Sequence, residues 1–183
     1  MTSKKIITHC APTLAGIKTA NLFNEQYSDE NVLLNEIQNF NLVFKDRGLK
    51  MVPLTLKNNN ALIYVYRIKD LEQDFCNELS KELLTKYGYD SSDILKSIKK
   101  LSGRMSDYID FPHEIGLFLG YPPEDVKGFI DNKAQNYKFV GYWKVYGDEE
   151  KAINTFNKYH QCQKIFLDRL NMGYTLKELV INK

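Results

Sequence analysis

The chain has 183 residues, a length that suits one domain and can bury a core without disulfides or a metal. A charged fraction of 26% and a net charge of +2 give no strong field for nucleic acid or an anionic membrane. Three widely spaced cysteines form no zinc-ligand ladder, and no apolar run is long enough for a membrane helix. We therefore expect a single domain over residues 1–183, a cytoplasmic location with free thiols, no membrane contact and no metal site.

The predicted elements begin with a short strand over Lys5–Thr8, a helical turn over Ala11–Gly16 and another strand over Ala20–Asn24. Ser28 can cap the first long helix, which Gly48 ends. The apolar residues of this helix recur at helical spacing and form one stripe, Leu33, Ile37, Phe40 and Phe44.

A cluster of asparagines separates two extended stretches. Leu49–Leu56 and Ala61–Ile68 flank the polar segment 57–60, and the second stretch is rich in β-branched and aromatic residues. Because asparagine tolerates positive φ, this pattern predicts a β-hairpin. Pro53 cannot donate to a ladder, so we expect its strand to lie at an edge or to carry a bulge.

The hairpin is followed by helical patterns. Asp70 and Gln73 fit a capping box for one helix that Gly88 ends. A further helix over about residues 92–102 carries a basic side, Lys96, Lys99, Lys100 and Arg104. We interpret that side as a solvated face rather than a phosphate track. Near the C-terminus, Phe139–Tyr146 alternates like a strand, and Asp148 caps a long helix towards Gly173.

The stretch His113–Ile130 fits two helices better than a strand. Gly120 can make the turn and Pro122 begins the second helix, which gives the spacing of a helix-turn-helix. The second helix opens with Glu124 and Asp125, an acidic end where a recognition helix would meet phosphates, so DNA binding is the minor hypothesis. The whole pattern predicts an α+β fold, a small and mostly antiparallel sheet covered by helices, with a helix-turn-helix-like unit near residues 92–131.

Four segments together resemble a bacterial family known only as a domain of unknown function. They are His9–Lys18, Tyr64–Arg67, His113–Ile130 and Gly141–Asp148. The resemblance spans nearly the whole chain and implies a cytoplasmic bacterial protein, but no activity. The family often has a proline where this chain has Thr19, a departure that bears only on local backbone stiffness.

The N-terminal motif could form a reactive thiol centre. His9 and Cys10 precede the expected helical turn, and a helix N-terminus beside His and Lys stabilises a thiolate. The same free N–H groups could hold an anion, with Thr13 and Lys18 close by. The alternative is that Cys10 is a small buried hydrophobe, His9 a core histidine and Thr13 a cap.

Two further residues are candidates for binding. Arg67 ends the second strand of the hairpin and could reach a carboxylate or phosphate, although a surface ion pair would explain it as well. His113, next to Glu114, could supply a general base or one side of a metal site. A glutamate in the first turn of a helix is, however, expected from the helix dipole alone.

These patterns favour a small-molecule or anionic-ligand-binding protein, with a thiol-dependent enzyme as one form of it. The candidate catalytic residues are Cys10 and His9, and the candidate ligand-binding residues are Thr13, Lys18, Arg67 and His113. The sequence identifies no cofactor, because it has no nucleotide-binding or hydrolase motif. The alternative is a non-catalytic interaction module that binds a protein partner, a second copy of the chain or, less favoured, DNA.

Overall fold

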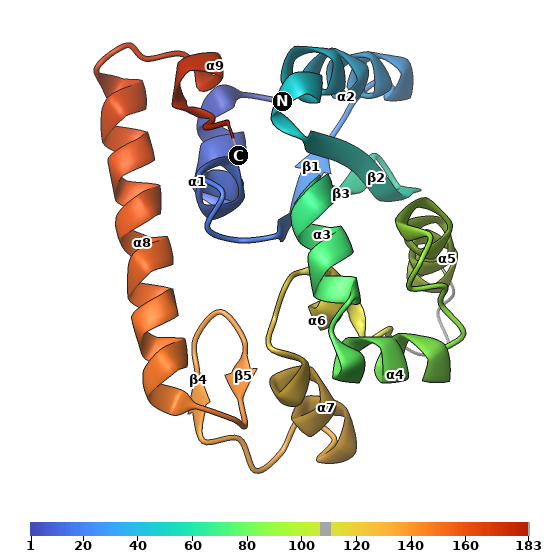
Figure 1. Cartoon of the computed structure of the whole chain (residues 1–183). Helices are drawn as coiled ribbons and strands as arrows, with labels where there is room; N and C mark the ends of the chain where they lie inside the picture. Colours follow the sequence, from blue (N-terminus) through green and yellow to red (C-terminus); the bar gives the residue numbers. More distant parts are fainter. Residues whose placement is uncertain (107–110, 183) are drawn as a thin grey trace.

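A three-stranded antiparallel sheet organises the fold in the computed structural model, which describes residues 1–106 and 111–182. The strands lie in the order β1-β3-β2 (Figure 1), with β1 at Ala20–Gln26, β2 at Leu49–Lys57 and β3 at Asn60–Arg67. The expected hairpin is confirmed, since β2 and β3 pair around Asn58 and Asn59, which have φ of 50° and 58°. Pro53 lies on the edge strand β2, and the register shifts between Pro53 and Thr55, so both expectations for this proline hold.

The remaining elements cover this sheet or extend from it. In chain order they are α1 (Ser3–Leu14), α2 (Glu30–Phe44), a short 3₁₀ turn (Lys45–Arg47), α3 (Ile68–Phe75), α4 (Glu78–Lys86), α5 (Ile94–Ser106), α6 (Ile115–Phe118), α7 (Pro123–Asp131), β4 (Phe139–Val140), β5 (Lys144–Val145), α8 (Glu149–Asn171) and α9 (Leu176–Leu179). The strands β4 and β5 form a separate two-stranded hairpin. The fold is α+β, as the sequence predicts.

The central strand β3 divides the apolar residues of the fold between two cores. Ile63 and Val65 point to a core shared with α1 and α2, while Tyr64 and Tyr66 point to a core shared with α3 to α7. Successive strand residues face opposite sides of a sheet, so a strand buried on both faces needs apolar residues throughout. The run from residue 61 to 66 is buried at five of its six positions, and position 62 is half-buried.

The first helix replaces two predicted elements. We expected a strand over Lys5–Thr8 and a helix start at Ala11, but α1 runs through both from its cap at Thr2, whose hydroxyl accepts from the N–H of Lys5. The β-branched residues before Cys10 favour a strand locally. The buried residues of α1, which include Ile7, Cys10 and Leu14, recur at helical spacing, and the tertiary packing of that face prevails over local propensity.

Three other boundaries differ from the predictions. Asp29 rather than Ser28 caps α2. The helix expected between Asp70 and Gly88 is two helices, because Asn77 caps a new start by accepting from the N–H of Ser80. The strand expected over residues 139–146 is the β4–β5 hairpin. By contrast, Asp148 caps the long helix α8 as predicted.

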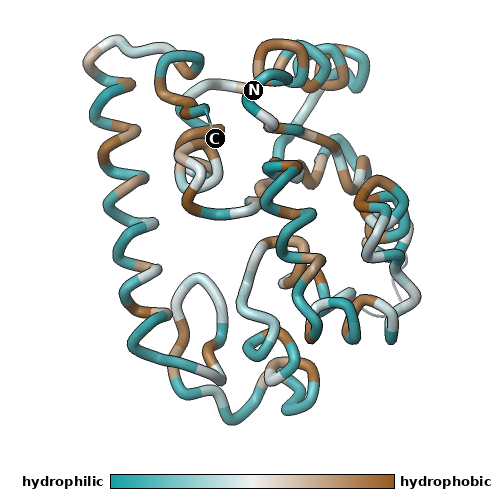
Figure 2. The backbone as a smooth tube through the Cα atoms, in the orientation of Figure 1, coloured by the Kyte–Doolittle hydropathy of each residue, from teal (hydrophilic) through white to brown (hydrophobic). Residues whose placement is uncertain are grey.

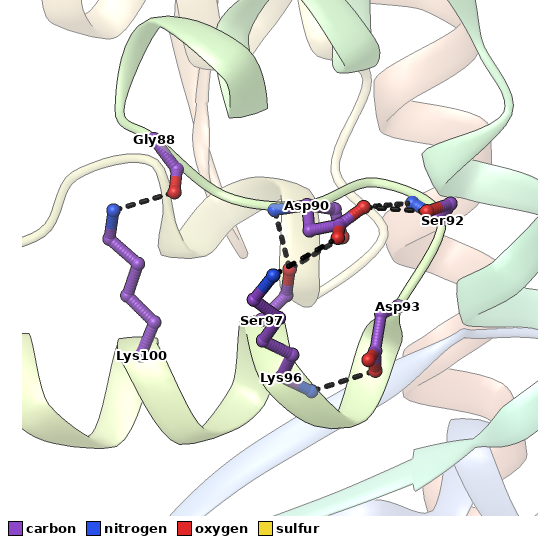
Figure 3. A network of polar contacts seen from close by, with 7 residues as sticks. All are labelled: Gly88, Asp90, Ser92, Asp93, Lys96, Ser97 and Lys100. Atoms are coloured by element: carbon purple, nitrogen blue, oxygen red, sulfur yellow. Dashed lines mark hydrogen bonds and ion pairs between the residues drawn. The ribbon is translucent and has the colours of Figure 1, made fainter.

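The loop before α5 holds the basic face of that helix in place (Figure 3). The N–H of Lys96 donates to Asp93 at 2.9 Å, and the hydroxyl of Ser97 donates to the carbonyl of Asp90 at 2.7 Å. The ammonium of Lys100 donates to the carbonyl of Gly88 at 2.6 Å, and that of Lys96 lies 3.4 Å from Asp90. These local partners agree with a solvated face rather than a phosphate track.

The helix α8 stands beside the rest of the fold, packed on α1 at its C-terminal half and reached by the β4–β5 hairpin near its N-terminal end (Figure 1). Hydrophilic and hydrophobic residues alternate along it (Figure 2). In residues 1–106 and 111–182, no helix combines the length and apolar character needed to cross a membrane.

Candidate functional site

Cys10 lies inside α1 rather than at the helix N-terminus from which the prediction of an activated thiol was argued. Its side chain has no exposed surface and belongs to the core that contains Ile7 and Leu14. Burial raises the pKa of the Cys10 thiol well above its ordinary value, and the nearby charge of Lys18 opposes this only in part. The observed role is the alternative one, a small buried hydrophobe.

His9 points the other way from its neighbour. It is exposed on α1 and stacks on Phe23, with ring centroids 5.5 Å apart and planes 8° from parallel. Desolvation lowers the pKa of the His9 imidazole, and the charge of Lys5 adds to that effect while Glu25 opposes it. His9 is thus neither a core histidine nor a partner of the Cys10 thiol.

Arg67 is a structural residue that joins three parts of the chain. Its side chain is 3% exposed, and its guanidinium donates from Nε to the carbonyl of Thr13 at 2.7 Å and from Nη2 to that of Leu14 at 2.8 Å. It also donates to the carbonyls of Ile181 at 3.0 Å and Arg47 at 3.2 Å. These carbonyls take the guanidinium donors that were expected to bind a ligand.

The hydroxyl of Thr13 is engaged as well. It donates to Asn21 Oδ1 at 2.7 Å, and the residue has no exposed surface. Thr13 therefore fixes the end of α1 against β1 instead of capping a helix start or lining a cavity with Cys10.

Lys18 is the buried cation of the N-terminal motif. It is 4% exposed, and its ammonium donates to the carbonyl of Leu119 at 2.9 Å and to that of Ala20. The ammonium also lies 5.1 Å from the centre of the Tyr121 ring. Burial lowers the pKa of Lys18 to about 7, against smaller opposing contributions from Cys10 and Asp74.

A polar cleft is lined in part by Lys18. It has a volume of about 220 Å³, and its lining includes Thr19, Asp70, Gln73, Asp74, Gly120 and Tyr159. The hydroxyl of Thr19 donates to Asp74 Oδ2 at 2.5 Å across this cleft. Asp70 and Asp74 make the cleft acidic, which does not suit the anion expected near Lys18.

His113 lies in a different cavity, which we call the aromatic pocket. This pocket has a volume of about 300 Å³ and is formed by the segment before α6, by α7 and by the β4–β5 hairpin. Its lining includes His113, Tyr121, Phe129, Tyr142, Trp143 and Lys144. The imidazole of His113 lies between two rings, 5.6 Å from Phe111 and 5.1 Å from Phe129.

Rings connect the aromatic pocket to Lys18. Tyr121 stacks on Trp143 with centroids 4.7 Å apart, and Trp143 meets Phe156 of α8 edge-on at 4.5 Å. The ammonium of Lys18 lies over the same Tyr121 ring. The buried lysine thus supports one wall of the pocket without belonging to its lining.

Asp125 holds the hairpin against α7. Its Oδ2 accepts from the indole N–H of Trp143 at 2.7 Å, and its Oδ1 accepts from the backbone N–H groups of Tyr146 and Gly147, each at 2.7 Å. Because Trp143 is fixed at both its ring face and its N–H, the wall that it forms is preorganised.

Glu114, the expected partner of His113, is turned away from it. Its carboxylate is 1% exposed, lies 2.5 Å from Arg104 and accepts from the hydroxyl of Tyr89 at 2.7 Å. The general-base pair and the one-sided metal site proposed from the sequence are therefore not formed. Within the described ranges, no group of three His, Cys, Asp or Glu side chains could hold a metal ion.

Sequence reasoning found one residue of the aromatic pocket, His113, and missed Tyr121, Trp143 and Lys144 as lining residues. The signal that could have found them is the set of four segments that carry the family resemblance. They meet in space, since Tyr64 donates to the carbonyl of Phe118 at 2.5 Å and Lys18 binds the next carbonyl along. The pocket forms where the segments His113–Ile130 and Gly141–Asp148 face each other.

Fold and site together define an α+β protein with an open aromatic pocket beside a buried lysine. The family model described as "Protein of unknown function (DUF3793)" matches residues 6–180, and the chain belongs to this family. No curated protein and no solved structure matches the chain.

Proposed function

We propose that this protein binds a small planar aromatic molecule in the aromatic pocket. The observation that carries the proposal is the composition of this cavity: five aromatic rings and an imidazole, from two separate parts of the chain, surround about 300 Å³ of open space. That volume lies at the lower end of the range for small-molecule sites, which are mostly apolar with a few polar groups. Stacking on fixed rings favours a flat ligand.

The other candidate sites support the proposal less well. A thiol-dependent reaction at Cys10 has no support, because that thiol is sealed in the core. The hairpin residues Tyr146 and Gly147 bind the first turn of α7 through Asp125, which argues against that helix end entering a DNA groove. A cytoplasmic, bacterial setting belongs to the same proposal, supported by three free cysteines and the family resemblance.

Trp143 provides a direct test, because it is the single tryptophan of the chain and lines the pocket. We would titrate the full chain with N-phenyl-1-naphthylamine, an uncharged aromatic probe, and follow energy transfer from Trp143 to the probe. We expect saturable binding at one site. Native mass spectrometry of freshly purified protein would show whether a small aromatic molecule is retained.

Two variants make the test specific. Phe129→Ala removes one wall of the pocket and should weaken probe binding by at least about tenfold, since a stacked ring contributes on the order of 1 kcal/mol beyond its buried area. Tyr174→Ala is the control, because Tyr174 is 49% exposed and lies outside the pocket. Equal affinity of wild type and Phe129→Ala, with both folded by circular dichroism, would overturn the proposal.

A further inference from the structure

We infer that the ligand of the aromatic pocket carries an anionic group and that Lys144 and His113 bind it. This inference rests on the proposed function and names the class of ligand, an aromatic ring system with one carboxylate, sulfonate or phosphate substituent. It follows from the hydrogen-bonding capacity that the pocket leaves unused.

The acceptor of the pocket is already occupied. Asp125 is 3% exposed, and its carboxylate accepts three hydrogen bonds from the β4–β5 hairpin, one from Trp143 and two from backbone N–H groups. Three donors offset much of its charge and leave it little capacity for a ligand. Glu114, the carboxylate next to His113 in the chain, is paired with Arg104.

Lys144 has more N–H donors than its partners in the protein use. The ammonium of Lys144 donates to the carbonyl of Ala134 at 2.8 Å, which leaves two of its three N–H groups. It is held over the rings of Tyr137 at 4.6 Å and Phe129 at 5.8 Å. No carboxylate within residues 1–106 and 111–182 forms an ion pair with it. A half-buried cation with unused donors attracts an anion.

His113 adds a second polar group on the same side. His113 is exposed, its ring lies near those of Phe111 and Phe129, and neither ring nitrogen forms a hydrogen bond with another residue that the structure describes. Phe129 is near both groups, 5.1 Å from the His113 ring and 5.8 Å from the Lys144 ammonium. A ligand ring stacked in the pocket would therefore bring an acidic substituent within reach of both.

The test uses two probes that differ by one charge. 8-Anilinonaphthalene-1-sulfonate has the ring system of N-phenyl-1-naphthylamine with an added sulfonate. We expect wild-type protein to bind the sulfonate at least about tenfold more tightly than the uncharged probe, both followed through Trp143. We expect Lys144→Met to remove this difference by weakening the sulfonate alone, and Lys144→Arg to restore part of it.

Lys138→Met is the matched control. Lys138 lies in the segment that leads into the same hairpin, is exposed and donates to the carbonyl of Gly147 outside the pocket, so its loss should change neither affinity. His113→Phe keeps the ring contacts and should weaken the sulfonate alone by about threefold. Equal binding of the two probes by wild type, or an equal effect of Lys144→Met and Lys138→Met, would overturn the anionic assignment while leaving the aromatic ligand. If neither probe binds, the proposed function fails first and this inference fails with it.

Discussion

Two lysines lie with their ammonium groups over aromatic rings, but they have different roles in this fold. Lys18 lies over Tyr121, is 4% exposed and binds two backbone carbonyls that join β1 to the end of α6. Lys144 lies over Phe129 and Tyr137, is half-buried and binds one carbonyl. The first ammonium holds the structure together, while the second retains unused donors and belongs to a residue that lines an open pocket.

The same division separates the N-terminal motif from the region after residue 111. In the N-terminal motif the polar groups of Thr13 and Lys18 bind other parts of the chain. Arg67 of β3 in turn donates to the carbonyl of Thr13. Around the aromatic pocket, polar groups with unused capacity lie beside exposed rings. A polar residue in a motif therefore indicates function only when its partners leave it free, and this depends on the tertiary structure.

The largest expected effect is on the reactivity of the three thiols. Cys76 is exposed, Cys162 is half-buried with its pKa raised to about 11 by desolvation, and Cys10 is sealed. Alkylation of Cys10 requires a large opening of the core, so it should be at least about a thousandfold slower than that of Cys76 in the native protein. The reactive thiol that the sequence suggests at Cys10 would instead be labelled rapidly. Peptide mass spectrometry after timed iodoacetamide labelling measures the rate at each thiol. Rapid labelling of Cys10 would contradict the burial of its side chain in the core.

Removing the guanidinium of Arg67 should cost the most stability. Arg67→Met removes four hydrogen bonds that join β3 to three other parts of the chain, among them the buried ones to Thr13 and Leu14, and should lower the free energy of unfolding by about 3 kcal/mol or more. Urea denaturation measures the change. Arg169→Met, at an exposed position near the end of α8, should change stability by less than about 0.5 kcal/mol. Similar losses in the two variants would show that Arg67 is not structural.

Substitutions at two glycines distinguish the effect of a constrained backbone from the effect of helix propensity. Gly120 has a φ of 70°, and a Cβ there would lie 2.5 Å from Thr19 Oγ1 and 3.0 Å from Asp74 Oδ2, so Gly120→Val should destabilise the protein by about 2 kcal/mol. Gly103 lies within α5, and among the described residues nothing outside its own stretch of helix comes within 4 Å of the corresponding position. Gly103→Ala should therefore stabilise it by about 0.5–1 kcal/mol. Thermal unfolding of both variants checks the two signs.

The sequence predicts the elements whose signals are local. The hairpin turn at Asn58 and Asn59, the bulge near Pro53 and the cap of α8 at Asp148 are each set by residues within a few positions, and each is confirmed. The start of α1 is not predicted, because Ile6 and Ile7 favour a strand locally and become helical only when the buried face packs on the sheet. Cap choice is similarly ambiguous where two candidates are adjacent, as at Asp29.

The candidate site is predicted less well than the fold, for a physical reason. Whether a polar group is available depends on partners far away in sequence, such as Leu119 for Lys18 and Ile181 for Arg67. Spacing along the chain carries no information about those contacts. His113 is found because its segment is distinctive, but its expected partner Glu114 faces Arg104 instead. Trp143 and Lys144 belong to a hairpin rather than the expected strand, so their common pocket could not be anticipated.

The last prediction concerns Lys18 and the pH dependence of stability. Burial lowers the pKa of Lys18 from 10.5 to about 7, so between pH 7 and 8.5 the unfolded chain binds a proton at this residue that the folded chain mostly lacks. The free energy of unfolding should then rise with pH in this window, by up to about 1.4 kcal/mol per pH unit from this residue. Below pH 7 both states bind the proton and the slope disappears.

Urea unfolding of wild type and Lys18→Met at pH 7.0, 7.75 and 8.5 measures this slope. The variant has no ammonium to titrate, so its stability should stay nearly constant with pH, whatever it loses because the carbonyls of Ala20 and Leu119 lose their donor. Cys10→Ala is the control: the raised pKa of Cys10 lowers stability mainly above pH 8.5, so this variant should keep the wild-type slope. Identical slopes in wild type and Lys18→Met would mean that Lys18 stays charged at neutral pH. Its hydrogen bonds to the two carbonyls and its contact with the Tyr121 ring would then offset the cost of burying the charge. The buried structural Lys18 and the available Lys144 would then differ only in the number of N–H donors that each leaves unused.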